Sequence, residues 1–141
     1  MKVADVMTRD VMTCRTTDTL MDCAAMMKEL NIGATPVVDE HNRLVGIITD
    51  RDIAVRAVAR GAAPAVSKVG DFMSPSPITV EPETNVEDAA EMMADNQIRR
   101  LPVVDRSGNL VGIVSLADLA VDVGEAELLA ETLEKISEPA R

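Results

Sequence analysis

The stretch LVGIITDRDIAV, residues 44–55, decides the fold, because it returns as LVGIVSLADLAV at residues 110–121. Each copy opens with an apolar run of the length and composition of a buried strand. A hydroxyl residue ends the run, at Thr49 or Ser115, and an aspartate follows three residues later, at Asp52 or Asp118. We therefore predict that each copy is a strand that passes directly into a helix.

The similarity extends far beyond these two stretches. When the chain is displaced by 66 residues, so that Lys2 falls on Lys68, it matches itself without a gap as far as Val55. KVADVMT falls on KVGDFMS, DCAAMM on DAAEMM, and TPVVD on LPVVD. Such a match indicates an internal duplication. A half of about 60 residues would bury only ~60% of its unfolded surface, so we expect the halves to pack together about a pseudo-two-fold axis.

Each half is predicted to contain strand, helix, strand, strand and helix, in that order. The first helices are expected at about 20–30 and 86–96, where Thr19 and Asn85 are typical N-cap residues. The following strands are joined by the turn-forming sequences DEHN and DRSG. In the first half the second helix should end near Arg60, with Gly61 as its C-terminal cap. The predicted boundaries are 1–60 for repeat 1, 61–67 for a linker, 68–122 for repeat 2 and 123–141 for a tail.

Composition limits the classes of function. The chain has 141 residues, 47% of them hydrophobic and 27% charged, which is typical of one globular domain. No apolar run approaches the ~20 residues that span a bilayer, and the start has no apolar signal-peptide core, so we expect a cytoplasmic protein without a membrane partner. A net charge of -10 disfavours nucleic acid as a main partner. The single aromatic residue, Phe72, provides no stacking platform for bases.

The sequence offers no catalytic or metal-binding group. Cys14 and Cys23 align with Val80 and Ala89, which is typical of small core residues rather than nucleophiles. Their spacing matches no zinc pattern, and the one histidine, His41, cannot complete a metal site. Since no nucleophile–base pair or phosphate loop is visible either, an enzyme is the least favoured class.

The motifs DVMT, PVVD and GIITDRD recur in order in both halves, and this pattern resembles a tandem pair of CBS domains, or Bateman module. The resemblance covers the chain except its tail. It implies an α/β (α+β) fold of two β-α-β-β-α repeats packed through their sheets with a cleft between them. It also implies that an adenosine-type ligand (AMP, ADP, ATP or S-adenosylmethionine) binds in the cleft as a regulatory ligand rather than an obligatory cofactor, and that modules form disc-like homodimers.

Two interpretations of the hydroxyl–acid turns are compatible. Thr49 with Asp52, and Ser115 with Asp118, fit a capping box that starts a helix. A carboxylate can also accept from ribose hydroxyls, and a glycine in the preceding strand permits close backbone approach. The resemblance implies that these four residues contact ribose or phosphate.

An arginine pair distinguishes the halves. Arg99 and Arg100 stand where the first half has Gly33 and Ala34, and the first half has only Arg51 beside its aspartate. Such a pair is often a solvated surface feature, but guanidinium groups suit phosphate because they donate in a planar fork. The resemblance implies that basic residues here reach nucleotide phosphates. We therefore expect the Ser115–Asp118 turn to be the better phosphate site.

The remaining predictions concern the base, the tail and the output. An adenine base would lie among four isoleucines, although core packing is the favoured role for any one of them: Ile32, Ile47, Ile98 and Ile113. Leu129, Leu133 and Ile136 predict an amphipathic tail helix, which packs either on its own repeat or against a partner; both remain open. The leading hypothesis is a nucleotide sensor that signals to an unknown effector protein by a change of shape or assembly. The alternative is a protein-interaction scaffold whose cleft is degenerate or empty.

Overall fold

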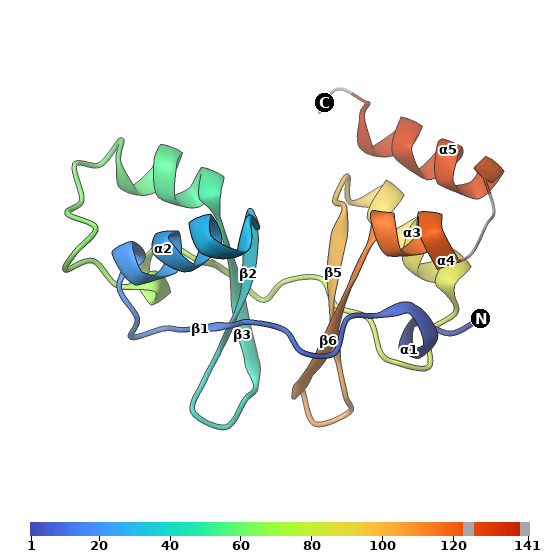
Figure 1. Cartoon of the computed structure of the whole chain (residues 1–141), viewed down its shortest axis with the longest axis horizontal. Coiled ribbons are helices and arrows are strands. Elements are labelled where there is room, and N and C mark those ends of the chain that lie inside the picture. The colour runs from blue at the N-terminus through green and yellow to red at the C-terminus, as the bar shows by residue number, and fades with distance from the viewer. Residues whose placement is uncertain (123–125, 139–141) are drawn as a thin grey trace. The chain divides into compact units, whose positions relative to one another are not determined.

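The computed structural model describes residues 1–122 and 126–138, with side chains at 1–119 and 130–138. It contains two compact units, which we name by the repeat that supplies most of each. The first-repeat unit is Met12–Pro77, and the second-repeat unit is Ile78–Arg141 together with Met1–Val11. Both units combine β-strands with helices (Figure 1). The predicted α/β fold of two repeats is therefore confirmed.

The first-repeat unit is built on a sheet of strand order β1-β2-β3-β4. The strands are β1 (Cys14–Arg15), β2 (Ala34–Val38), β3 (Leu44–Thr49) and β4 (Ser74–Pro75). The β1–β2 pair is parallel, and the other pairs are antiparallel. The helices are α2 (Leu20–Leu30), a π-helix η1 (Asp52–Ala57) and a 3₁₀ turn η2 (Val69–Asp71).

Helix α2 begins and ends where its sequence predicts. The Asp22 N–H donates to Thr19 Oγ1 at 3.1 Å, which satisfies one of the free donors of the first turn. Asn31 ends the helix in the left-handed conformation, with φ 54°. Between these caps the residues at helical spacing, Leu20, Cys23 and Met27, are buried in the core of the unit.

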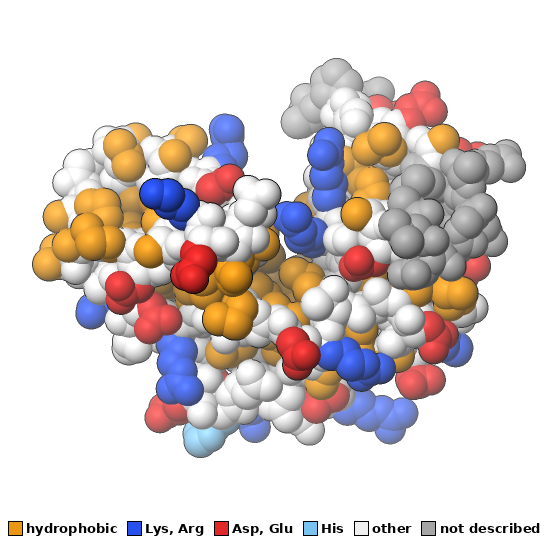
Figure 2. Space-filling model, viewed as in Figure 1, with side chains coloured by type: hydrophobic (Ala, Val, Ile, Leu, Met, Phe, Trp, Pro, Cys, Tyr) orange, Lys and Arg blue, Asp and Glu red, His pale blue; other side chains and the backbone are white. Residues whose placement is uncertain are grey.

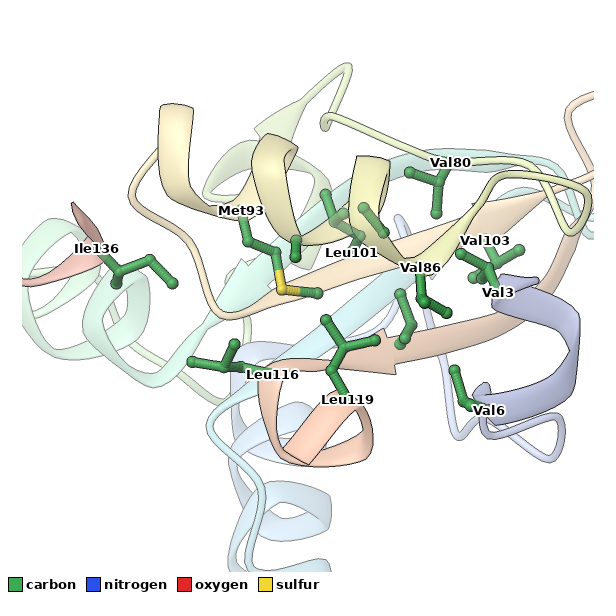
Figure 3. Close-up of a cluster of buried hydrophobic side chains, with 13 residues drawn as sticks. Val3, Val6, Val80, Val86, Met93, Leu101, Val103, Leu116, Leu119 and Ile136 are labelled. Carbon is green, nitrogen blue, oxygen red and sulfur yellow. The ribbon is translucent and has the colours of Figure 1, made fainter. Parts of the chain in front are cut away.

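The second-repeat unit repeats this plan around an antiparallel β5–β6 pair. Its elements are α1 (Val3–Val6), α3 (Val86–Asp95), β5 (Arg100–Val104), β6 (Leu110–Ser115), α4 (Leu116–Asp122) and α5 (Ala126–Ile136). Val80 forms a parallel bridge to Val103, at the position where the first-repeat unit has β1. In the core shown in Figure 3, Met93 and Leu101 lie between the helices and the sheet, and Val3 lies near Val86 and Val103.

One predicted cap is wrong. Asn85 occupies the N-cap position of α3, but its side chain accepts no hydrogen bond from the first turn of the helix. The side-chain oxygen of Asn85 accepts instead from Lys2 Nζ at 3.2 Å. A residue distant in sequence has thus replaced the local capping partner.

The segment that begins each repeat packs in the unit of the other repeat. Lys2 bridges Asn85 and Thr8 bridges Ile113 in the second-repeat unit. At the equivalent places in the first-repeat unit, Lys68 bridges Thr19, and Ser74 pairs with Ile47. The predicted boundaries at 1–60, 61–67 and 68–122 follow the duplication in the sequence. The compact units instead exchange residues 1–11 and 68–77, which we call the exchanged segments.

Two glycines make room for the exchanged segments. A Cβ on Gly46 would lie 2.5 Å from Met73 Sδ and 2.9 Å from the Ser74 carbonyl oxygen. A Cβ on Gly112 would lie 2.7 Å from Met7 Sδ and 2.8 Å from the Thr8 carbonyl oxygen. In the sequence, a glycine in each strand indicates room for close approach, in support of a ligand, whereas the structure places the backbone of the exchanged segment there.

The first repeat's second helix differs from its prediction. It starts after Thr49 as expected, but π-helical bonding over Asp52–Ala57 ends before Arg60. A turn leads on to Gly61, whose φ of 71° and N–H bond to the Val58 carbonyl at 2.9 Å fit the predicted terminating role.

The tail forms helix α5, which packs on α3. Ile136 is buried in the core of the second-repeat unit. Leu133 is 43% exposed, and the side chain of Leu129 lies outside the described residues. The Ile136 side of the helix therefore packs on its own repeat, while Leu133 remains accessible.

Candidate functional site

Both strand-to-helix turns carry a complete capping box. At the first, the Asp52 N–H donates to Thr49 Oγ1 at 3.0 Å and the Thr49 N–H donates to Asp52 Oδ2 at 2.9 Å. At the second, the Asp118 N–H donates to Ser115 Oγ at 3.1 Å and the Ser115 N–H donates to Asp118 Oδ2 at 2.8 Å. The capping interpretation is confirmed at both turns. Each aspartate retains one further carboxylate oxygen, Oδ1, for other partners.

The β5–β6 pairing brings the arginine pair to the second turn. Arg100 lies directly opposite Ser115 in the antiparallel register, and residues so paired project from the same face of a sheet. The Leu116 N–H donates to the Arg99 carbonyl oxygen at 2.8 Å, which fixes the start of β5 against the start of α4. Ala34 holds the place of Arg100 opposite Thr49. Basic side chains therefore flank the second turn from the neighbouring strand, but not the first.

The guanidinium groups of the pair face solvent. Arg99 and Arg100 are both exposed, and neither forms an ion pair with a side chain that the structure describes. Figure 2 shows basic side chains grouped on the second-repeat unit over the upper part of β5. In a chain of net charge -10, two neighbouring unpaired cations offer an anion-binding patch.

The first turn has a different set of charges. Arg51 is exposed, and its backbone N–H donates to Asp50 Oδ1 at 2.8 Å. Arg56 Nη1 lies 3.7 Å from Asp52 Oδ1, and the same nitrogen donates to the Phe72 carbonyl oxygen at 2.8 Å. Sequence reasoning missed Arg56, although its place four residues after Asp52 on a predicted helix was a usable signal.

The four isoleucines are all half-buried, and they have different neighbours. Ile32 and Ile98 pack against the cores of their units, as the core interpretation expects. The Ile113 N–H donates to the Thr8 carbonyl at 2.9 Å and its carbonyl accepts from the Thr8 N–H. Ile47 pairs with Ser74 at the equivalent position. The backbone of the exchanged segments therefore occupies this strand edge, and any contact with a base would be made by the side chains.

The remaining polar candidates have structural surroundings. Cys14 and Cys23 are buried side by side, and the hydrogen bond to Cys23, together with burial, raises the pKa of the Cys14 thiol. His41 lies exposed in a hairpin turn. Among the described residues no three His, Cys, Asp or Glu side chains gather as metal ligands. No helix in the described ranges is long and apolar enough to cross a bilayer.

A groove of about 310 Å³ lies between α3 and α5. Its lining residues are Ala94, Asp95, Gln97, Lys135 and Glu138. None of them belongs to either strand-to-helix turn, and two of the five are acidic. The groove is therefore separate from the candidate site.

The sequence is similar to one known family over most of its length. The CBS domain model matches residues 3–58 and 69–124. The CBS domain-containing protein YhcV of Bacillus subtilis is 44% identical over 135 residues, which cover 96% of this chain and 94% of YhcV. YhcV therefore has little sequence beyond the part that corresponds to this chain.

Two similar solved structures contain adenosine-type ligands. CBSX2 of Arabidopsis thaliana in complex with AMP has a TM-score of 0.78 and 29% identity, over 88% of this chain and 96% of that one. The CBS domain pair of protein MJ0100, in complex with 5′-methylthioadenosine and S-adenosyl-L-methionine, has a TM-score of 0.75 and 32% identity, over 85% and 97% of the two chains. Chains with this fold thus accommodate an adenosine group that carries different substituents.

Proposed function

This chain belongs to the CBS domain family, and we propose that it is a regulatory sensor of an adenine nucleotide, with AMP, ADP and ATP as the candidate ligands and S-adenosylmethionine as a related one. The AMP complex of CBSX2 and the S-adenosylmethionine complex of the MJ0100 pair support the ligand class. The choice of a nucleotide rests on residues of this chain, and above all on the arginines next to the second turn.

The Ser115–Asp118 turn with Arg100 carries the proposal. Oδ2 of Asp118 is held by the capping box, so Oδ1 is the atom that would accept from the ribose hydroxyls. Arg100 pairs with Ser115 across the sheet, and its guanidinium, with that of Arg99, would donate to a phosphate. The aliphatic faces of Ile98 and Ile113 would lie against the base, because the chain has no aromatic residue other than Phe72.

The Thr49–Asp52 turn, with Arg51 and the side chains of Ile32 and Ile47, is the weaker candidate for the same ligand. It has the same capping hydrogen bonds, but Gly33 and Ala34, at the start of the neighbouring strand, stand in place of the two arginines. Without those two cations the electrostatic attraction between a bound phosphate and this turn is weaker.

The output of the sensor would be a change of shape or assembly that an effector protein recognises. We expect homodimers, as the family resemblance implies. Val55, Val58 and Val66 of the first-repeat unit are 47%, 59% and 72% exposed, and they are candidates for an interaction surface if they form one patch. The same observation supports the alternative, a protein-interaction scaffold that takes no nucleotide.

Calorimetric titration with AMP and with adenosine tests the proposal. Asp118→Ala should weaken both ligands by about 10- to 100-fold, because a hydrogen bond to a charged group contributes roughly 1.5–3 kcal/mol. Asp52→Ala is the matched control, since it removes an equivalent capping box and should cost a similar ~1 kcal/mol of stability. Its nucleotide affinity should stay within about twofold of wild type. Equal affinity in all three proteins would reject the site and favour the scaffold.

A further inference from the structure

Asp52 and Asp118 differ in what surrounds their remaining carboxylate oxygen. In both capping boxes Oδ2 accepts the backbone N–H of the hydroxyl residue. Oδ1 of Asp52 then lies 3.7 Å from Arg56 Nη1, and the side chain of this aspartate is 15% exposed. No described side chain forms an ion pair with Asp118. The oxygen that a ribose would need thus has a guanidinium at ion-pair distance at the first turn only, although the Arg56 side chain is itself 45% exposed.

Arg56 is held in place by a second contact. Its Nη1 donates to the carbonyl oxygen of Phe72 at 2.8 Å, and Phe72 is a buried residue of the exchanged segment, directly after the η2 turn. The Arg60 guanidinium lies over the phenyl ring of Phe72, with its central carbon 5.6 Å from the centre of the ring. Moving the Arg56 guanidinium away from Asp52 would therefore also break its bond to a buried part of the fold.

The second repeat has the opposite charge at this position. Arg56 falls on Asp122 in the duplication, so the residue four places after Asp118 is acidic. An arginine at this spacing from an aspartate attracts it, whereas a second aspartate repels it. The asymmetry is therefore present in the sequence as well as in the contacts.

We propose that Arg56 is a specificity-determining residue that prevents the Thr49–Asp52 turn from binding the ribose of an adenosine-type ligand, so that the protein takes one such ligand per chain. This inference rests on the proposed function. A ribose hydroxyl that approached Oδ1 would compete with the guanidinium beside it, and it would offer a neutral donor in place of an ionic contact. The capping box itself would remain, because it uses Oδ2 and the Thr49 hydroxyl.

The test is calorimetric titration of Arg56→Met with adenosine. Adenosine is the probe because it has no phosphate, so the lost positive charge does not by itself weaken binding. Wild type should bind one adenosine per chain, and Arg56→Met should bind two. Arg60→Met is the matched control, because it removes the same charge from the same Phe72 contact region without touching Asp52. It should bind one.

Further variants separate failure of this inference from failure of the proposed function. Arg56→Gln keeps an amide that can donate to the Phe72 carbonyl, so it replaces Arg56→Met if the latter does not fold. In an Asp118→Ala background, removing Arg56 should restore binding of one adenosine per chain, at the first turn.

If Asp118→Ala weakens adenosine binding but Arg56→Met still binds one adenosine per chain, the inference is wrong and the proposed function stands. If Arg56→Met binds adenosine more weakly than wild type, Arg56 is a ligand contact and the inference is also wrong. If Asp118→Ala binds as wild type does, the proposed function itself fails.

Discussion

The turns at Thr49–Asp52 and Ser115–Asp118 have the same two capping hydrogen bonds, all between 2.8 and 3.1 Å, but they stand among different charges. Arg56 lies against the carboxylate of the first turn, whereas Arg99 and Arg100 flank the second from the neighbouring strand. The backbone contacts that set the fold are shared by the two repeats, and the side chains that could select a ligand are not.

The largest expected effect concerns the shared framework. Gly46→Ala and Gly112→Ala should each destabilise the protein by up to about 3 kcal/mol, because the new methyl group would overlap a methionine sulfur and a backbone carbonyl. Chemical denaturation measures the loss. Adding Met7→Ala to Gly112→Ala should not restore stability, since the Thr8 carbonyl would still be 2.8 Å from the new Cβ. A loss below about 0.5 kcal/mol in either single variant would contradict the close packing of the exchanged segments.

The next effect sharpens the difference in charge. Arg100→Ala should weaken AMP by about tenfold, or 1.4 kcal/mol, and leave adenosine almost unchanged, because adenosine has no phosphate to lose. Arg106→Ala, which removes an exposed arginine from the β5–β6 hairpin turn, is the charge-matched control in the same titration. If Arg100→Ala and Arg106→Ala have the same effect on AMP, the arginine pair is only a solvated surface feature.

A smaller effect tests a difference between the two cores. Thr35 is fully buried in β2 with no hydrogen-bond partner for its hydroxyl, and the duplication places it on Leu101. Thr35→Val should raise the free energy of unfolding by about 1 kcal/mol, because it removes a buried polar group without changing the shape of the side chain. Thr35→Ser keeps the hydroxyl and loses the methyl group, so it should lower stability. A decrease in the thermal midpoint of Thr35→Val would mean that the hydroxyl has a partner in solution.

The smallest effect on stability concerns the tail. Leu133→Ala should change the free energy of unfolding by less than about 0.5 kcal/mol, because the side chain is 43% exposed. Sedimentation equilibrium of wild type should show the expected homodimer with and without AMP. If Leu133→Ala dissociates that dimer, the exposed side of α5 is part of the interface. A wild-type monomer at tens of micromolar in both conditions would contradict the expected assembly.

The sequence predicted much of this architecture because the fold relies on local signals written twice. The hairpins around DEHN and DRSG and the boxes at Thr49 and Ser115 depend on residues that are close in sequence, and the duplication presents each of these signals twice. The exchange of the segments 1–11 and 68–77 does not, since nothing local indicates which sheet a short segment will join. The Asn85 cap failed for the same reason, because its partner, Lys2, is distant in sequence.

The candidate site was predictable in part. The Ser115–Asp118 pattern and the alignment of Arg99 and Arg100 with Gly33 and Ala34 were visible in the sequence, and the β-sheet register places them together. The second contact of Arg56 was not visible, because Phe72 is supplied by the exchanged segment. The nucleotide contacts of all these residues stay predictions.

A crystal structure of the wild-type protein grown with AMP tests the inequality of the two turns most directly. We predict density for AMP at the second turn, with a ribose oxygen within hydrogen-bond distance of Asp118 Oδ1 and the phosphate at Arg100, and an intact Arg56–Asp52 contact without ligand at the first turn. AMP bound through Asp52, or with its phosphate away from the arginine pair, would contradict this account.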